Sequence, residues 1–274
     1  MKRSITLLTG ICCLFLTVQS QSITSLTPHQ AYQKGIDAIE SNNHIEALPL
    51  LEKAAEANIP GAYAPLINMY ADGSYNGSGI GNYHEAFYWT LKGFNVFMNS
   101  DNPDRNLGVT CMMYYDPLCF LTGDYHETIR HATTGYSSGM PELASLYSII
   151  GASYLKLDDK LNATKYLEKG KSLSEKSGNI FDILTTNALL AKIAIDNKNY
   201  DKAIALSKDA ATIGGIPLAS FVYGVALIKT KKNPEEGKKW IKRAVDYKYS
   251  GIFEINCFKD EIEQYWETIE NTDF

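Results

Sequence analysis

The chain has 274 residues, of which 45% are hydrophobic and 21% charged, and its formal net charge is −5. The apolar fraction and the 18 Tyr, 10 Phe and 3 Trp exclude a disordered chain, and the length is sufficient for one or two domains with a full core. The acidic balance argues against a nucleic-acid-binding protein, because an acidic surface repels the phosphate backbone.

Residues 1–20 have the pattern of a secretory signal peptide. Two basic residues precede an apolar run over positions 5–18, and Ser20 and Ser22 are both small enough for cleavage nearby. The run is shorter than the roughly 20 residues of a membrane span. The sequence therefore predicts an exported protein, periplasmic or secreted, without a transmembrane segment and with a short linker at 21–27. An uncleaved N-terminal anchor is the alternative.

One pattern recurs six times along the rest of the chain: a small residue, a large residue three positions later and a second small residue at seven. Seven residues make about two helical turns, so both small residues lie on one face, where they allow a neighbouring helix to approach closely. The six instances are Ala47, Leu50, Ala54; Ala86, Trp89, Gly93; Thr128, His131, Gly135; Ala163, Tyr166, Gly170; Ala203, Leu206, Ala210; and Gly237, Trp240, Ala244.

Each of these helices is preceded by another. In four repeats a further small residue lies 12 or 13 positions before the pattern, and Asn, Asp and Pro residues of turns lie between. No segment alternates apolar and polar residues over more than a few positions, as a strand does. The predicted fold class is all-α: a right-handed α-solenoid of about six helix-turn-helix repeats over residues 28–248. Residues 249–274 place apolar residues at helical spacing and are predicted to form a C-terminal capping helix.

Two stretches resemble the Sel-one-like repeat, a relative of the tetratricopeptide repeat (TPR). The first has Ala62, Leu66, Tyr70 and Gly73 followed by Ala86, Trp89 and Gly93; the second has Ala219, Tyr223 and Gly224 followed by Gly237, Trp240, Arg243 and Ala244. The other units have the shorter TPR spacing. The resemblance implies a curved adaptor or scaffold that binds proteins or peptides and has no conserved reaction.

No motif points to a cofactor or a metal ion. The glycine-rich stretch 73–81 lacks the strand and the helix N-terminus of a phosphate-binding loop, so a loop extension is predicted. His44, His84 and His126 occur in one phase at the starts of second helices, too far apart in successive repeats to share a metal ion.

Catalysis is not expected either. Glu127 beside His126, and Asp158 beside Asp159, are the acid–base candidates, but adjacent residues in a turn point apart. The sequence therefore predicts a protein that is not an enzyme. The alternative is a secreted hydrolase acting on cell-wall or β-lactam substrates, an activity of some secreted relatives that carry one cysteine pair per repeat.

The first helix of each pair is expected to line a concave groove that binds an extended or helical peptide. The expected contacts with the peptide lie one residue after or three residues before the small residue of a first helix. They are Tyr32, Asn68, Ser148 and Lys192. Seven basic residues between Lys229 and Arg243 form either a solvated helix face or a docking patch for an acidic partner.

The third repeat has Asp116 and Pro117 where a small helical residue is expected. Because proline disfavours helix at the residue before it, the first helix of this pair is predicted to break there. A turn at the break would allow a disulfide between Cys111 and Cys119, which are too far apart on an unbroken helix. Two reduced, buried thiols are the alternative.

Tyr114 and Tyr115, next to the predicted break, are candidates for a partner contact site. The alternative is a degenerate repeat in which these aromatic side chains fill the gap left by the kink. Cys257 lies about three repeats away from the other cysteines and is predicted to remain a free, buried thiol.

Overall fold

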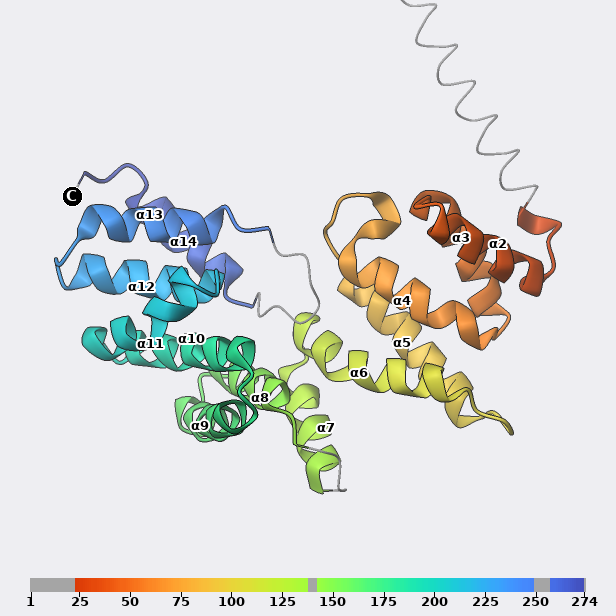
Figure 1. Ribbon diagram of the computed structural model, residues 1–274, viewed down its shortest axis with the longest axis horizontal. Coiled ribbons are helices and arrows are strands. Elements are labelled where there is room, and N and C mark those ends of the chain that lie inside the picture. Colours follow the sequence, from red (N-terminus) through yellow and green to blue (C-terminus); the bar gives the residue numbers. More distant parts are fainter. Residues whose placement is uncertain (1–22, 138–141, 249–256, 274) are drawn as a thin grey trace, which may run out of the picture. The chain divides into compact units, whose positions relative to one another are not determined.

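The computed structural model describes residues 23–137, 142–248 and 257–273 (Figure 1). These residues form thirteen α-helices and two short 3-10 helices, and no strand occurs among them. The chain divides into two compact units, unit 1 up to Tyr115 and unit 2 from Asp116 onward. The predicted signal peptide lies outside the described residues.

Unit 1 holds two helix pairs and most of a further first helix. Its helices are α2 (Pro28–Glu40), α3 (His44–Glu56), α4 (Tyr63–Asp72), α5 (Tyr83–Met98) and α6 (Arg105–Leu121), which continues into unit 2. The members of the pairs α2–α3 and α4–α5 pack side by side (Figure 1). The glycine-rich stretch is, as predicted, a loop between α4 and α5, with one 3-10 helix at Ser74–Asn76.

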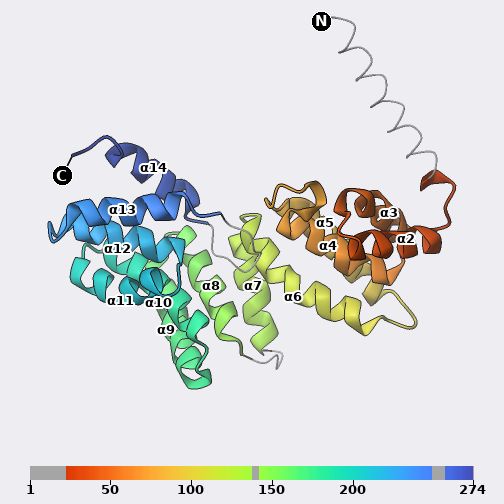
Figure 2. The same cartoon turned by 45° about the horizontal axis from the view of Figure 1, so that its top comes forward.

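Unit 2 is also built from helix pairs. Its further helices are α7 (Tyr125–Ser137), α8 (Ala144–Lys156), α9 (Lys160–Ser177), α10 (Ile180–Asp196), α11 (Tyr200–Thr212), α12 (Pro217–Lys229), α13 (Pro234–Val245) and α14 (Lys259–Ile269). The pairs are α8–α9, α10–α11 and α12–α13, after α7, which follows α6. The first helices also contact one another in sequence, α8 with α10 and α10 with α12 (Figure 2).

Every second helix begins at an Asn or Asp that caps it. The side chain accepts a hydrogen bond from the backbone N–H three residues later, an interaction that contributes about 1 kcal/mol to helix stability. The caps of α3, α5, α7, α9, α11 and α13 are Asn43, Asn82, Asp124, Asp159, Asn199 and Asn233. The turn residues seen in the sequence therefore set where each second helix starts.

Except for Gly135, which is half-buried, the small residues of the repeated pattern are buried where paired helices cross. The first members Ala47, Ala86, Thr128, Ala163 and Ala203 are all 0% exposed. In the last pair the two backbones themselves approach closely, because a Cβ on Gly224 would lie 2.5 Å from the carbonyl oxygen of Gly237. Where the large residue is aromatic it packs on an aromatic ring of the first helix, as Trp240 does on Tyr223 with centroids 5.7 Å apart. The predicted all-α fold of stacked helix pairs is confirmed.

The C-terminal helix α14 packs against α13 (Figures 1 and 2). Ile262, Ile269 and the preceding residue Phe258 are buried in the core of unit 2, together with most of α12. A helix therefore does close unit 2, although it covers only part of the predicted range 249–274, whose residues 249–256 lie outside the described residues.

The prediction that the third first helix breaks at Asp116 and Pro117 was wrong. α6 is continuous from Arg105 to Leu121 with Pro117 inside it. Proline removes one backbone hydrogen bond and costs about 3 kcal/mol in a helix interior. Tertiary contacts on both sides offset this cost, because Leu118 is fully buried and the buried Asp116 carboxylate bonds to His131 of α7 at 2.7 Å.

Cys111 and Cys119 are free thiols on this continuous helix. Eight residues correspond to about 12 Å along a helix axis, beyond the reach of a disulfide. Burial raises the pKa of Cys111 to about 11. Cys257 is also a free thiol; the residue is half-buried rather than fully buried, and burial of its sulfur raises its pKa above the usual value.

Candidate functional site

Unit 1 brings three of the predicted binding residues into contacts between successive repeats. The Tyr32 side chain on α2 lies over Gly61 of the 3-10 helix Pro60–Ala62, directly before α4, where an added Cβ would be 2.6 Å from the Tyr32 hydroxyl oxygen. The Tyr114 hydroxyl on α6 donates to the side-chain oxygen of Asn68 on α4. Asn68 is exposed and Tyr114 is half-buried. We call the surface that these residues mark, along α2, α4 and α6, the unit 1 first-helix face.

Tyr115 contacts a different helix from the one that Tyr114 contacts. Its ring packs edge-on against Phe87 of α5, with centroids 5.6 Å apart, so it contributes to the contact between α5 and α6. A different set of α6 side chains is exposed: Val109, Met112 and Met113 are each at least 50% accessible. Their spacing of three and four residues places them on one side of the helix.

Ser148 and Lys192 do not line an open groove, in contrast to the prediction. Ser148 on α8 is 2% exposed, and its hydroxyl lies 3.0 Å from that of Thr186 on α10. Lys192 on α10 is 6% exposed. Both residues lie on first helices, as expected. Ser148 joins α8 to α10, whereas Lys192 is covered by α14.

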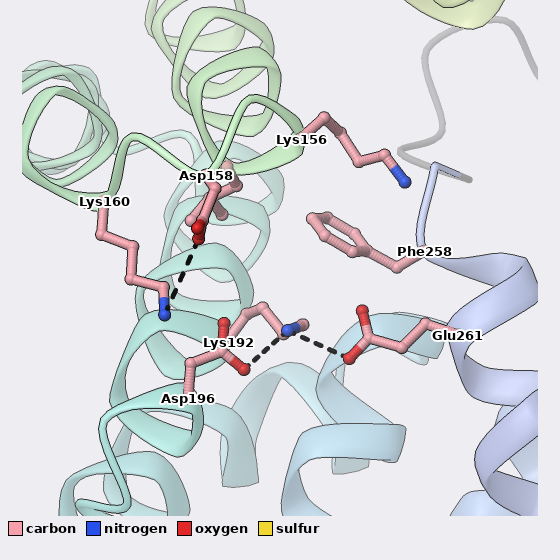
Figure 3. A pocket seen from close by; sticks show the side chains of 8 residues that line it. Lys156, Asp158, Lys160, Lys192, Asp196, Phe258 and Glu261 are labelled. Carbon is pink, nitrogen blue, oxygen red and sulfur yellow. Dashed lines mark hydrogen bonds and ion pairs between the residues drawn. The ribbon is translucent and has the colours of Figure 1, made fainter.

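Lys192 binds two carboxylates from different helices (Figure 3). Its Nζ lies 2.7 Å from Oδ1 of Asp196 on α10 and 3.0 Å from Oε1 of Glu261 on α14. Burial disfavours the charged ammonium, but the hydrogen bond with Asp196 and the charge of Glu261 outweigh burial, so the pKa of Lys192 is raised. Removing either partner would leave part of this buried charge uncompensated.

Phe258 lies between two lysines where α14 begins. The Nζ atoms of Lys156 on α8 and of Lys192 are each 5.7 Å from the centroid of its ring, and Figure 3 shows these side chains facing one another. Lys156 also donates to the carbonyl of Cys257 at 2.9 Å. A pocket of about 410 Å³ opens beside this cluster, lined by Leu155, Lys156, Asp158, Lys160, Lys192, Asp196, Phe258 and Glu261.

The rest of α14 is held by α12 and α13. The Tyr265 ring packs edge-on against Phe221 of α12, with centroids 5.5 Å apart. Lys242 of α13 lies over the Trp266 ring at 5.8 Å, and Lys238 donates to the Thr272 carbonyl at 2.8 Å. We call the surface of α8, α10 and α12 that Phe258, Glu261 and Tyr265 contact the unit 2 first-helix face.

Sequence reasoning missed this contact, although α12 carries a signal for it. Residues 218–227 of α12 are all buried, including the side that faces α14. A helix that is apolar all round must be covered on all sides. In an open groove one side of α12 would have been polar, so its composition indicates a covering element.

The acid–base candidates of the sequence have structural roles. Glu127 accepts a hydrogen bond from Nε of Arg130 at 2.7 Å, Asp159 caps α9, and Asp158 is an exposed turn residue. His131 bonds to Asp116, and this hydrogen bond raises the pKa of His131. Within the described residues no three His, Cys, Asp or Glu side chains are grouped so that they could hold a metal ion.

The predicted basic stretch runs from the last residue of α12, Lys229, through the following turn to α13. A second pocket, of about 550 Å³, is lined by Lys239, Lys242, Arg243, Asp246, Tyr247 and Lys248. Lys242 pairs with Asp246 at 2.8 Å, and Arg243 stacks over the Trp240 ring at 5.2 Å. Among the helices described, none is long and apolar enough to cross a membrane.

No family model matches the sequence, and no curated protein matches it. Among solved structures, the chain is similar to the crystal structure of YrrB, described as a TPR protein with an unusual peptide-binding site. The two are 17% identical with a TM-score of 0.41, over 80% of this chain and 98% of that chain.

Proposed function

We propose that this protein is a non-catalytic interaction scaffold whose first-helix faces bind a protein or peptide partner. The contacts of α14 support this proposal. Side chains of α8, α10 and α12 together bind α14 and the residues just before it. The contacts combine an ion pair, a ring between two ammonium groups and an edge-on aromatic pair. These are common means of helix recognition in a groove.

In unit 1 the corresponding face supplies exposed groups for a partner. The amide of Asn68 is at the surface beside the Tyr114 hydroxyl, which fixes its orientation. We place the partner site of unit 1 at Asn68 and Tyr114.

The proposal includes two further points, a Sel-one-like or TPR-like repeat type and export directed by residues 1–20. The small-residue pattern supports the first, and the charged and apolar segments of the N-terminus support the second. Cell fractionation with N-terminal sequencing tests export. A chain that starts near residue 21 outside the cytoplasm supports it, and a cytoplasmic chain that retains residues 1–20 contradicts it.

Affinity capture with a matched pair of variants tests the scaffold function. Asn68→Lys places a long charged side chain on the unit 1 first-helix face, and Asn95→Lys makes the same change at an exposed position of α5. We expect a partner retained from cell-envelope extracts by wild type and by Asn95→Lys to be lost with Asn68→Lys, at unchanged Tm. Equal recovery with all three chains would contradict the proposed site.

A further inference from the structure

The contacts of α14 extend beyond those of a helix that only closes the last pair. Such a cap would contact α12 and α13. Phe258 and Glu261 instead lie against Lys156 of α8 and Lys192 of α10, which belong to earlier pairs. α14 and the residue before it therefore reach all three first helices of the unit 2 first-helix face.

Opposite charges meet across this contact, where Lys192 pairs with Glu261. α14 carries the acidic residues Asp260, Glu261, Glu263 and Glu267 against one lysine, and the helices beneath it contribute Lys156, Lys192, Lys238 and Lys242. Its buried residues are Ile262 and Ile269. An isolated helix of this length is marginal in water, so its contacts with unit 2 stabilise it as they would a bound peptide.

We propose that the unit 2 first-helix face is a binding site for an acidic amphipathic helix of a partner protein, and that α14 occupies it until the partner displaces it. This inference rests on the proposed scaffold function and specifies the partner. The partner helix has an aromatic residue that packs between Lys156 and Lys192. Three positions later an acidic residue pairs with Lys192, and seven positions after the first aromatic residue a second one packs on Phe221.

The tether of α14 sets how tightly such a partner must bind. Val245 and Lys259, the end of α13 and the start of α14, are separated by a short connection. Because α14 belongs to the same chain as its site, a separate partner at micromolar concentration displaces α14 only if it binds more tightly than α14 does. The pocket beside Lys160 offers room for the additional contacts.

A competition experiment on the full chain tests the proposal. The probe is a fluorescein-labelled peptide with the sequence of residues 257–273, and binding is measured by fluorescence anisotropy. Phe258→Ala combined with Glu261→Lys weakens the chain's own α14, because the new lysine faces Lys192. We expect this double variant to bind the probe at least 10-fold more tightly than wild type does. Equal, weak binding by both chains would overturn the proposal.

A matched pair of lysine variants locates the probe. Added to the double variant, Lys192→Met should return probe binding to the wild-type level, since it removes the ion pair with Glu261. Lys165→Met, at an exposed position of α9, should leave binding unchanged. Equal effects of the two substitutions would place the peptide elsewhere and overturn the site.

Hydrogen exchange on the wild-type chain gives a result that does not depend on the folding of any variant. The amides of α14 should exchange faster than those of α10 and α12, and excess unlabelled probe should accelerate them further. Exchange of α14 only at the rate of α12 would identify a fixed cap and overturn the proposal. The Asn68→Lys experiment addresses unit 1 and does not involve α14, so the two proposals can fail separately.

Discussion

Substitution of Gly224 by alanine tests whether close helix crossings hold the pairs together. A Cβ at this position of α12 would lie 2.5 Å from the carbonyl oxygen of Gly237 and 3.2 Å from the backbone nitrogen of Ile241, both on α13. Backbone atoms of a helix cannot rotate away, so α12 and α13 must separate. A gap of about 0.5–1 Å already loses a quarter to a half of the dispersion energy across the contact.

The expected loss follows from two opposing effects. Replacing glycine by alanine in a helix interior stabilises the helix by about 1 kcal/mol. Overpacking of a tight contact typically costs about 1–3 kcal/mol, and an immobile backbone obstacle favours the upper end. We therefore expect Gly224→Ala to destabilise unit 2 by about 1–2 kcal/mol.

Gly35 of α2 is the matched control, because it holds the equivalent position in the first repeat. Its Cβ would meet side-chain atoms of Leu51 at 2.9 Å, which can shift more easily than a helix backbone. Gly35→Ala should change stability by less than about 0.5 kcal/mol. Urea unfolding followed by circular dichroism measures both variants. A Gly224→Ala chain as stable as wild type, or less affected than Gly35→Ala, would refute the reasoning.

Two further predictions concern α7 and α11. Hydrogen bonding to Asp116 raises the pKa of His131, so this stabilisation is present below the unfolded pKa of about 6.5 and is lost as pH rises through the folded value. Between pH 5.5 and 8.5 the Tm of wild type and of His126→Gln should therefore fall more than that of His131→Gln, and parallel curves would contradict this assignment. Ala203 is fully buried and Ala205 is exposed on the same helix, so Ala203→Leu should cost about 1–3 kcal/mol in urea unfolding and Ala205→Leu less than about 0.5 kcal/mol.

The sequence was sufficient to predict the helix pairs because their determinants are local. Asn43 and Asn199 cap second helices through backbone groups three residues away. Ala47 and Ala203 are buried because the second helix must approach the first closely. The capping residue and the small residue both recur in each repeat, so the pattern in one repeat supports the prediction for the others.

The interpretation of α6 failed because a local rule was applied without tertiary context. Proline predicted a break, but burial of Leu118 and the bond between Asp116 and His131 keep the helix continuous through Pro117. The division of the chain within α6 has no sequence signal that we identified.

The candidate site was predicted only in part, because its contacts are distant in sequence. Asn68 was selected from its place in a repeat and Tyr114 from its position next to the predicted break, but their hydrogen bond joins different repeats. Lys192 was assigned to an open groove, whereas Glu261 and Phe258 cover it from the C-terminal helix. No short-range pattern specifies such a contact; only the uniformly apolar composition of α12 indicates that a cover exists.

Site-specific photocrosslinking tests most directly the claim that first-helix faces bind the partner. A photoreactive phenylalanine derivative replaces Asn68 in one chain and Asn95 in another, and both chains are irradiated in cells of the source organism. The account predicts a covalent adduct with one protein from position 68 and no such adduct from position 95. An adduct from position 95 alone, or the same adduct from both positions, would contradict it.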